Sequence, residues 1–420
     1  MMIDPFLCRL CGNPTHRFLS LGACPSPNRL LTLGEIGQPE PAYPMDLTFC
    51  ENCWVVQSEA TIPPEDIFTV YPYSSSTAAT TRAHFEGLAD TLVRDHGLGP
   101  GSVVVEIASN DGVLQRPLRD RGVRAIGVEP ARNICELAWR DGLITLNEFF
   151  TEATVEKIGE GAADAIIACN VYTHLPALHT FTENVRRLLK PTGIFVIEIE
   201  YLLDMIQQAA YGNVYQDHVS YFTLGSLAKL LEAHGLFVFH AERISPQGGS
   251  LRCFASPNPR PSNLPLLVTE KELGLYSLST YEEFAKKVED SKRSLVTLLR
   301  ELKGAGKTIA GYGAAAKGLS LLNYCHFGAE TLSYIIDDSI LKQGRLTPMN
   351  HLPIVGPERL REAPVDYLLV LAWNMTDEIK TKTRDLRVKY IVPPLLHSKS
   401  EVFCALQRQE QAACIPEDPL

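Results

Sequence analysis

Short apolar runs alternate with helical periodicities through the middle of the chain. The first run, 103–107, is dense in β-branched residues, which is typical of a buried strand in a parallel sheet. The small side chains of Ser109-Asn110-Asp111-Gly112 then suit a tight turn into a helix. The same rhythm predicts strands at 125–129, 143–146, 164–170 and 193–201, and helices at 78–96, 177–190 and from Gly112 to Arg121, where Pro117 predicts a kink or a late start. Such alternation predicts an α/β fold with a doubly wound sheet.

A second α/β unit is predicted toward the C-terminal end. The stretch 307–318 predicts a strand, a Gly-x-Gly turn and the start of a helix that ends at Tyr324, and further strands are predicted at 332–338 and 366–373. The turn could bring backbone close to a pyrophosphate, with Lys317 as a countercharge near the helix N-terminus. A purely structural Rossmann-like turn explains the two glycines equally well.

A shift in composition separates the two units. A helix from Thr223 to His234 and a last strand at 251–255 close the first unit, and the proline-rich stretch 257–262 is typical of a linker. The charge-rich periodicity of 281–303 predicts an exposed helix. We therefore expect three domains, at 1–77, 78–262 and 263–420.

Composition narrows the class of protein. A chain of 420 residues with 45% hydrophobic and 21% charged residues is typical of a soluble globular protein of two or three domains. A net charge of -10 and a pI of 5.6 argue against broad nucleic-acid binding, although a local basic pocket stays compatible with them. No apolar run reaches membrane-spanning length and the first residues lack the layout of a signal peptide, so we expect a cytoplasmic protein with reduced cysteines.

Two C-x-x-C pairs near the N-terminus predict a metal site. Cys8-Arg9-Leu10-Cys11 and Cys50-Glu51-Asn52-Cys53 can each present two thiolates from a tight turn. Together Cys8, Cys11, Cys50 and Cys53 complete a tetrahedral Zn²⁺ shell with no open position, so the expected metal is structural. The loop-rich segment between the pairs has few strong helix or strand signals, so a structural metal would be needed to stabilise it. Chance pairs, a redox motif, or Cys24 as a substitute ligand are the alternatives.

Polar residues follow the predicted strands at the sheet edge where α/β folds bind nucleotides. Glu129 ends the second strand, at the spacing where a carboxylate can accept both ribose hydroxyls, and Asn170 ends the fourth. Phe149 and Phe150 follow the third strand, where an aromatic ring could wall a purine or pack in the core.

With its single-glycine turn, this constellation resembles the class I S-adenosylmethionine-dependent methyltransferases. Rossmann dehydrogenases share the ribose acid but approach a pyrophosphate through a three-glycine turn. S-adenosylmethionine has no pyrophosphate, and its ammonium and sulfonium groups favour nearby carboxylates. The resemblance implies cofactor contacts from Glu106, Ala108, Asn110, Asp111, Gly112, Glu129, Phe149, Phe150 and Asn170.

The segment 211–222 carries residues suited to proton transfer. His218 stands beside Asp217 and among three tyrosines, and an unperturbed histidine is a neutral base at physiological pH. Asp217 could orient His218 or bind substrate, and a cluster that only packs and caps is the alternative. Ahead of the first strand, the hydroxyl-dense segment 71–77 could line a polar pocket, or supply a Ser or Thr N-cap for the next helix.

With all its parts together, the chain resembles the nucleotide-sugar C-methyltransferases of deoxysugar biosynthesis over nearly its whole length. The motifs that carry the resemblance are the two C-x-x-C pairs, Glu106-Ile107-Ala108-Ser109-Asn110-Asp111-Gly112, Tyr215-Gln216-Asp217-His218, Gly248-Gly249-Ser250-Leu251-Arg252, and Gly311-Tyr312-Gly313-Ala314-Ala315-Ala316-Lys317-Gly318. The family implies a small zinc-binding N-terminal domain, a central class I methyltransferase domain, and a C-terminal Rossmann-like α/β domain that contributes to nucleotide-sugar binding.

The resemblance also implies roles for single residues. His218 would be the base, with Tyr215 and Asp217 at the reacting carbon. The implied substrate contacts are Tyr71, Tyr73, Ser75, Asn170, His174, Tyr221, Tyr312 and Lys317. Two positions depart from the family pattern, which more often has Glu at Asp217 and Gly at Met349.

The implied reaction methylates the ring carbon next to the keto group of a thymidine-diphosphate 4-keto-deoxysugar. Only an adjacent carbonyl makes such a C–H acidic enough, so His218 would remove the proton while hydroxyls including that of Tyr215 stabilise the enolate. The expected partners are S-adenosylmethionine, Zn²⁺ and the nucleotide-linked keto-deoxysugar, with no nucleic acid and no membrane, and the chain is expected to be a monomer. The alternatives are an O- or N-methyltransferase, an NAD(P)-linked sugar oxidoreductase, and a non-catalytic zinc-ribbon protein.

Overall fold

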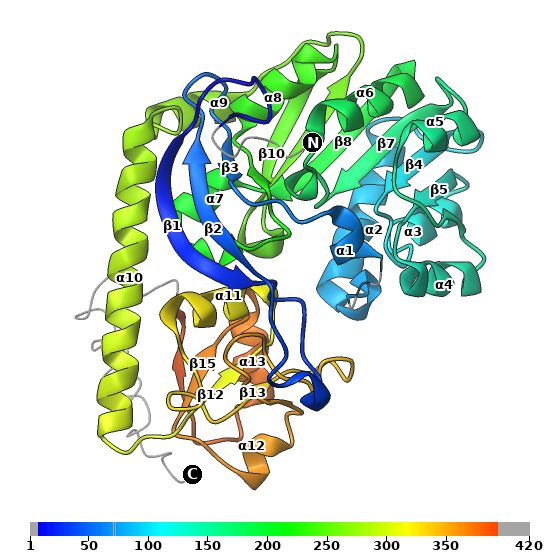
Figure 1. The fold of residues 1–420 in the computed structure, drawn as a ribbon. Helices are drawn as coiled ribbons and strands as arrows, with labels where there is room; N and C mark the ends of the chain where they lie inside the picture. Colours follow the sequence, from blue (N-terminus) through cyan, green and yellow to red (C-terminus); the bar gives the residue numbers. More distant parts are fainter. Residues whose placement is uncertain (1–6, 70, 72, 394–420) are drawn as a thin grey trace, which may run out of the picture. The chain divides into compact units, whose positions relative to one another are not determined.

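The computed structural model describes residues 7–69, 71 and 73–393 (Figure 1). They form two compact units that interleave along the chain. The described residues within 1–16, 48–203 and 217–278 form the first, and those within 17–47, 204–216 and 279–420 form the second.

A seven-stranded sheet forms the centre of the first unit, in the order β10-β11-β8-β7-β4-β5-β6. The strands are β4 (Val103–Ile107), β5 (Arg124–Val128), β6 (Ile144–Leu146), β7 (Ala163–Cys169), β8 (Leu189–Glu200), β10 (Phe237–Ile244) and β11 (Ser250–Ser256). β4 to β8 pair in parallel, whereas β11 is antiparallel to both β8 and β10. Strand order reverses between β4 and β7, and doubly wound sheets bind ligands outside the carboxyl ends of strands at such a point.

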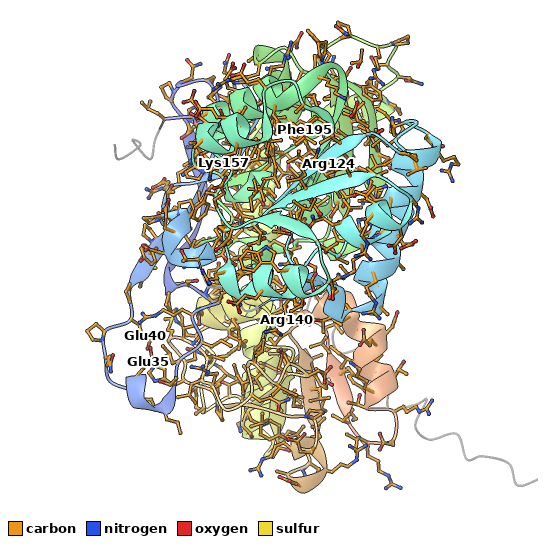
Figure 2. All side chains as sticks on the ribbon, turned by 90° about the vertical axis from the view of Figure 1, so that its right-hand side faces the viewer. Glu35, Glu40, Arg124, Arg140, Lys157 and Phe195 are labelled. Atoms are coloured by element: carbon orange, nitrogen blue, oxygen red, sulfur yellow. The ribbon has the colours of Figure 1, made fainter. Side chains whose placement is uncertain are left out.

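Helices cover both faces of this sheet (Figure 1). They are α2 (Ala79–Arg94), α3 (Gln115–Asp120), α4 (Arg132–Arg140), α5 (Glu152–Ile158), α6 (Leu178–Leu188) and α8 (Leu224–Ala233). Phe85 of α2 and Leu118 of α3 pack with Val196 on one face, while α6 and α8 pack on the face that contains Phe195. In Figure 2, Phe195 lies among the side chains of the sheet core and Lys157 lies at the periphery. The apolar periodicities of the helices thus match the two buried faces of the sheet.

A buried glutamate fastens a further helix of the first unit to α8. Glu270, on α9 (Pro265–Glu272), accepts hydrogen bonds from the backbone N–H groups of Leu224 (2.5 Å) and Gly225 (3.0 Å) and from the hydroxyls of Tyr201 (2.7 Å) and Tyr276 (2.6 Å). A carboxylate at a helix N-terminus satisfies donors that the helix leaves unpaired. Thr223 caps the same helix through the N–H of Ser226, as the sequence predicts.

The second unit holds a five-stranded, fully parallel sheet in the order β14-β13-β12-β15-β16. Its strands are β12 (Ile309–Tyr312), β13 (Ile335–Ile336), β14 (Ile354–Val355), β15 (Tyr367–Val370) and β16 (Lys389–Ile391), and its helices are α10 (Leu278–Gly304), α11 (Ala316–Cys325), α12 (Arg359–Glu362) and α13 (Thr376–Lys382). The loop with Glu35 and Glu40, labelled in Figure 2, is fixed by bonds between Leu31 and Leu346 and by an ion pair of 2.5 Å between Glu40 and His351.

One expectation about strands is wrong, and one strand of the seven-stranded sheet was not predicted. The stretch between the cysteine pairs contains β1 (His16–Pro25) and β2 (Ala42–Phe49), which are hydrogen-bonded neighbours, and Leu19 and Leu21 of β1 are buried in alternation. The strand predicted at 251–255 has an unpredicted partner, β10, at the edge of the sheet. Only Ala241 of β10 is buried, so the strand lacks the apolar pattern that would have predicted it.

The other predicted strands and helices occur within a few residues of their predicted positions. α3 begins only at Gln115 with Pro117 in its first turn, which confirms the late start. Within 7–69, 71 and 73–393, no helix is both long enough and apolar enough to cross a membrane.

Candidate active site and zinc centre

Four thiols meet where the sequence predicts a metal. The sulfur atoms of Cys8, Cys11, Cys50 and Cys53 all lie within 4.8 Å of one another, and Cys24 is not in the cluster. A tetrahedron with Zn–S bonds of about 2.3 Å has edges of about 3.8 Å, so this spacing fits Zn²⁺. Four sulfur ligands fill the coordination shell and give the metal a structural role.

Residues inside each C-x-x-C pair bind the helices of the first unit. The carbonyl of Leu10 accepts a bond from His179 of α6 (2.8 Å), and that of Asn52 accepts one from Lys229 of α8 (2.6 Å). The Lys229 ammonium also lies 3.3 Å from the centre of the Trp54 ring. The zinc cluster is therefore anchored on the body of the first unit by its own backbone.

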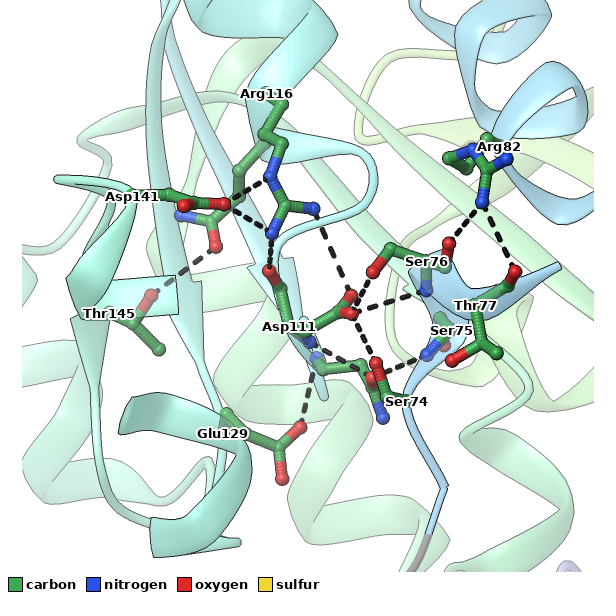
Figure 3. Close-up of polar contacts among 12 residues, drawn as sticks. Ser74, Ser75, Ser76, Thr77, Arg82, Asp111, Arg116, Glu129, Asp141 and Thr145 are labelled. Atoms are coloured by element: carbon green, nitrogen blue, oxygen red, sulfur yellow. Dashed lines mark hydrogen bonds and ion pairs between the residues drawn. The ribbon is translucent and has the colours of Figure 1, made fainter. Parts of the chain in front are cut away.

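The turn after β4 grips the hydroxyl-rich segment 73–77 (Figure 3). The Asp111 carboxylate accepts hydrogen bonds from Ser74 Oγ (2.5 Å) and from the N–H (3.2 Å) and hydroxyl of Ser76. Asn110 accepts from the N–H of Ser75 (2.9 Å) and donates to the carbonyl of Tyr73 (3.2 Å). The structure thus joins two predicted substrate contacts, Tyr73 and Ser75, to one predicted cofactor contact, Asn110.

This contact decides between two interpretations of the hydroxyl-rich segment. Helix α2 begins after Ala78, which is its N-cap residue and has no side-chain cap, so the alternative of a Ser or Thr N-cap is wrong. The hydroxyls of Ser74 and Ser76, which we did not single out, instead bind Asp111. A run of serines before a helix gave no signal for that long-range contact.

Three carboxylates gather at the carboxyl ends of β4 and β5. Glu129 accepts hydrogen bonds from the N–H groups of Asn110 (3.0 Å) and Ala131 (2.9 Å). Among the described residues, Glu106 Oε2 and Asp111 Oδ1 are buried and accept no hydrogen bond, although Arg116 lies 4.0 Å from Asp111 Oδ1. Burial, together with the charges of Asp111 and Glu129, raises the pKa of Glu106 well above its usual value, and burial also raises the pKa of Glu129.

Buried, incompletely satisfied carboxylates fit a cationic ligand. The ammonium and sulfonium groups of S-adenosylmethionine would offset the repulsion among Glu106, Asp111 and Glu129. The backbone at this edge is unusual too, because Ala108, Asn110 and Asn170 have φ angles of 53°, 50° and 56°. Left-handed backbone at non-glycine residues costs about 1–3 kcal/mol and clusters at functional sites.

The other candidate cofactor residues Gly112, Asn170 and Phe150 have different surroundings. Gly112 has a φ of 83°, and a Cβ there would lie 2.1 Å from Leu143 Cδ1, so the turn favours glycine. Asn170 is exposed just after β7. The Phe150 ring packs on Phe181 (5.2 Å between centroids), which is the packing that we weighed against a purine wall.

The backbone around His218 is held on both sides. The carbonyl of Asp217 accepts from His174 Nδ1 (2.6 Å), and the N–H of Val219 donates to the carbonyl of Thr173 (2.7 Å). Tyr221 donates its hydroxyl to the carbonyl of His218 itself (3.2 Å). Both peptide groups that flank the His218 Cα atom are thereby fixed.

A carboxylate lies beside the His218 ring, and it belongs to Glu200. Glu200 Oε2 lies 3.4 Å from His218 Nδ1, and both side chains are largely buried. Glu200 ends β8, so the rule that singled out Asn170 at the end of β7 would also have found it. A carboxylate at Nδ1 favours the tautomer whose Nε2 lone pair is available.

Aromatic rings connect this histidine with the segment near the cofactor turn. Successive ring centroids lie 5.8 Å apart from Tyr71 to Phe68, 5.2 Å from Phe68 to His174, and 4.9 Å from His174 to His218. Burial raises the pKa of the Tyr71 phenol, and the charges of Asp217 and Glu129 raise it further. Burial lowers the pKa of His174, against the opposing charge of Asp217.

A second buried glutamate holds α2 against β8 and β11. Glu198 binds His84 (2.7 Å) and Arg252 (2.5 Å), and Arg252 also reaches Glu242 (3.1 Å). Burial raises the pKa of Glu198, but the His84 hydrogen bond and the Arg252 charge outweigh it and leave the pKa below its usual value. Arg252 belongs to a motif quoted above, and its role here is to pair β11 with its two neighbours.

The remaining candidates belong to the second unit. Tyr215 is partly buried after η4 (Tyr211–Asn213). The Tyr312 hydroxyl donates to Asp338 (3.1 Å), and Lys317 is buried in the first turn of α11 with its ammonium 5.7 Å from the centre of the Trp373 ring. Their part in substrate binding stays a prediction.

Known proteins match the chain over most of its length. Three family models match it: a zinc binding domain over 8–68, a methyltransferase domain over 82–241, and a C-methyltransferase C-terminal domain over 245–393. C-methyltransferase NovU of Streptomyces niveus is 34% identical over 397 residues, which cover 92% of this chain and 94% of that protein. The chain belongs to the C-methyltransferase family. This C-methyltransferase is an enzyme that uses S-adenosylmethionine, and its four-cysteine cluster is a zinc site, which confirms the predicted family and cofactors.

Two solved structures overlap the C-methyltransferase in part. The PH0226 protein from Pyrococcus horikoshii OT3 is 16% identical with a TM-score of 0.37, and the match covers 45% of this chain and 97% of that one. The 1,6-didemethyltoxoflavin-N1-methyltransferase of Burkholderia thailandensis is 18% identical with a TM-score of 0.34, and the match covers 50% of this chain and 96% of that one. At these values neither similarity adds to the family assignment.

Proposed function

We propose that the enzyme methylates the ring carbon beside the keto group of a thymidine-diphosphate 4-keto-deoxysugar, with His218 as the base. The single observation that carries the proposal is a buried histidine whose backbone is fixed on both sides and whose ring faces Glu200. A proton on carbon needs a positioned base, whereas methyl transfer to an oxygen or nitrogen lone pair does not need one at carbon.

His218 would act through Nε2. The Glu200 carboxylate 3.4 Å from Nδ1 favours a proton on that nitrogen, which leaves the Nε2 lone pair to accept the α-proton of the keto-sugar. Glu200 would then stabilise the imidazolium that forms. The carbonyl of Asp217 is engaged by His174, so His174 positions this segment.

Phenols would stabilise the enolate oxygen. Tyr215 is our candidate donor, and Tyr71, whose phenol stays protonated at neutral pH because burial raises its pKa, is available near the cofactor acids. When bound, S-adenosylmethionine supplies the electrophilic methyl group that the enolate carbon takes. Glu106, Asp111 and Glu129 would hold its cationic part, and the segment 73–77 would close over the turn that carries Asp111.

We further propose that the chain works as three domains, 1–77, 78–262 and 263–420, of which the last contributes Tyr312 and Lys317 to the nucleotide end of the substrate. The Asp217 carboxylate would contact the reacting sugar, and its reach is one methylene shorter than that of the glutamate more common in the family.

The test is mass spectrometry of products from a panel of nucleotide-linked keto-sugars incubated with S-adenosylmethionine. We expect a single added methyl group, on carbon, for a thymidine-diphosphate 4-keto-deoxysugar, and a loss of at least about 100-fold in turnover for His218→Gln. His240→Gln, a change at an exposed histidine on β10, is the matched control. Near-normal turnover of His218→Gln would show that another group is the base.

A further inference from the structure

The arginine inside the first C-x-x-C pair reaches the catalytic segment. Arg9 stands between the zinc ligands Cys8 and Cys11, and its Nη1 donates to the carbonyl of Val219 at 2.8 Å. Its Nη2 donates to Thr61 Oγ1 at 2.8 Å. Val219 directly follows His218, so the zinc centre and the proposed base are joined by one side chain.

Arg9 is itself held by the strand that pairs with this segment. Its N–H donates to Gln57 Oε1 (2.9 Å), and Gln57 Nε2 donates to the carbonyl of Leu7 (2.8 Å). Gln57 lies on β3 (Val56–Ser58), opposite Ser220 of β9 (Ser220–Tyr221). The first C-x-x-C pair, β3 and β9 therefore form one continuous hydrogen-bonded assembly.

The backbone of Val219 is hydrogen-bonded through both its N–H and its carbonyl group. Its N–H donates to the carbonyl of Thr173 (2.7 Å), which lies just after β7, whereas its carbonyl accepts from Arg9 and from the N–H of Ser58 (3.1 Å). The bond from Arg9 is the charge-assisted one and is the stronger type. Loss of the guanidinium would leave the carbonyl with the Ser58 N–H as its remaining donor of these two, and would leave the bond from the Val219 N–H to Thr173 intact.

We propose that Arg9 is a positioning residue that sets the orientation of His218 from the zinc centre. The inference rests on the proposed function, because it concerns the orientation of the proposed base. On this account the cysteine cluster does more than stabilise the N-terminal segment: it fixes the backbone from which Arg9 extends to the catalytic segment. A shift of about 1 Å in a catalytic group can cost about 100-fold in rate.

The geometry of the guanidinium explains why the position suits arginine. Its planar fork can serve the two acceptors, Val219 O and Thr61 Oγ1, at the same time. A lysine would keep the charge but approach as a single point, so it would retain one of the two bonds. A glutamine would lose the charge and most of the reach.

The experiment compares Arg9→Gln and Arg9→Lys with Arg17→Gln, a matched change at an exposed arginine that bridges to Asp46. For Arg9→Gln we expect kcat to fall about 10- to 100-fold, while the stoichiometry and Kd of S-adenosylmethionine binding by calorimetry stay unchanged. Arg9→Lys should fall between Arg9→Gln and the unaltered enzyme, and Arg17→Gln should match the unaltered enzyme. Zinc content by elemental mass spectrometry should stay at one per chain in all variants, because the Arg9 side chain is not a zinc ligand.

A second readout follows His218 directly. In protein labelled with ¹³C at histidine Cε1, the His218 signal, assigned by its loss in His218→Gln, should shift in Arg9→Gln, while the His84 signal should not. An unchanged His218 signal together with an unchanged kcat would overturn the positioning role. If Arg9→Gln does not fold, as zinc loss or substoichiometric S-adenosylmethionine binding would reveal, Arg9→Lys carries the same comparison.

The two proposals fail differently. If His218→Gln retains turnover, the proposed base is wrong, whatever the Arg9 variants do. If His218→Gln is inactive but Arg9→Gln has a normal kcat and an unshifted His218 signal, the base stands and the role of Arg9 is wrong.

Discussion

The two units build the same turn between parallel strands, but the charges around that turn differ. In the first, Glu129 after β5 accepts a hydrogen bond from the N–H of Asn110 in the turn after β4 (3.0 Å). In the second, Asp337 after β13 accepts one from the N–H of Ala314 in the turn after β12 (2.8 Å). An acid at the end of the second strand thus braces the turn after the first strand in both units.

The difference lies in what neutralises that acid. In the second unit, Lys342 lies 3.4 Å from Asp337 and donates to the carbonyl of Ala314 (2.9 Å), so the charge is balanced internally. In the first unit, Glu106 and Asp111 add further negative charge beside Glu129, and burial raises the pKa of Glu106. The acids of the first unit could therefore bind a cationic ligand, whereas in the second unit Lys342 supplies the cation.

The largest expected difference between the two units comes from removing one acid beside each turn. Glu106→Gln should weaken S-adenosylmethionine binding by about 10- to 100-fold, because hydrogen bonds to charged groups contribute about 1.5–3 kcal/mol. Asp337→Asn should leave that affinity unchanged. Calorimetric titration measures both, and equal losses in the two variants would show that the turns do not differ as described.

Removing the internal cation tests the second unit. Lys342→Met leaves Asp337 without its counterion and should destabilise the second unit by about 1–3 kcal/mol, a range reduced because Lys342 is partly exposed. Hydrogen exchange of β12 and β13 amides reports the loss. Asp337→Asn combined with Lys342→Met should recover part of it, and no recovery would argue against a direct interaction.

The turn glycines should differ in how well they tolerate a side chain. Gly112 and Gly313 have φ angles of 83° and 92°. A Cβ at Gly112 would meet the end of the flexible Leu143 side chain, whereas one at Gly313 would lie 2.6 Å from Ala372 Cβ and 3.1 Å from its backbone nitrogen. We expect Gly313→Ala to cost about 2 kcal/mol or more and Gly112→Ala about 1 kcal/mol. Denaturant unfolding that gives the reverse order would contradict the packing described.

Cofactor affinity should depend on pH through the acids of the first turn. Because burial raises the pKa of Glu106 and Glu129, their protonated forms stabilise the ligand-free protein at low pH, and that contribution is lost as pH rises through their folded-state pKa values. A bound cation lowers those pKa values, so S-adenosylmethionine should bind more tightly as pH rises above about 4.5, by up to about tenfold per unit for each proton released. Glu106→Gln should make the affinity for S-adenosylmethionine depend less on pH. An unchanged pH dependence in this variant would contradict the role of Glu106.

The smallest effect concerns a position outside both turns. Met349, where the family more often has glycine, has a φ of 68°, so the loop keeps a left-handed backbone without the residue that suits it. Met349→Gly should therefore stabilise the second unit by about 0.5–1 kcal/mol, measured by denaturant unfolding. Destabilisation would mean that the Met349 side chain contributes more than the backbone strain costs.

Local sequence patterns predicted many of the strands and helices but few of the side-chain contacts between them. The run 103–107, the strand that precedes Glu129 and the paired cysteines depend on neighbours in sequence, so β4, an acid at the end of β5 and the four-thiol cluster could be predicted. β10 could not, because an edge strand with one buried residue has no apolar alternation.

The features of the site that could not be predicted are side-chain contacts between segments that lie far apart in the sequence. Glu200 and His218 come from different elements, and Arg9 and Val219 are 210 positions apart. Only the folded sheet brings these pairs together. The sequence offered Asp217, the neighbour of His218, as a group that could orient it or bind substrate, whereas the carboxylate found beside the ring belongs to Glu200.

Exchange of the α-proton of a thymidine-diphosphate 4-keto-deoxysugar in D₂O, followed by proton NMR with S-adenosylhomocysteine in place of the methyl donor, tests the central claim most directly. Proton removal by His218 predicts enzyme-dependent loss of the α-proton signal, slowed at least about 100-fold in His218→Gln and unaffected in His240→Gln. Exchange by His218→Gln at the rate of the unaltered enzyme, or carbon methylation by an enzyme that never exchanges the proton, would contradict it.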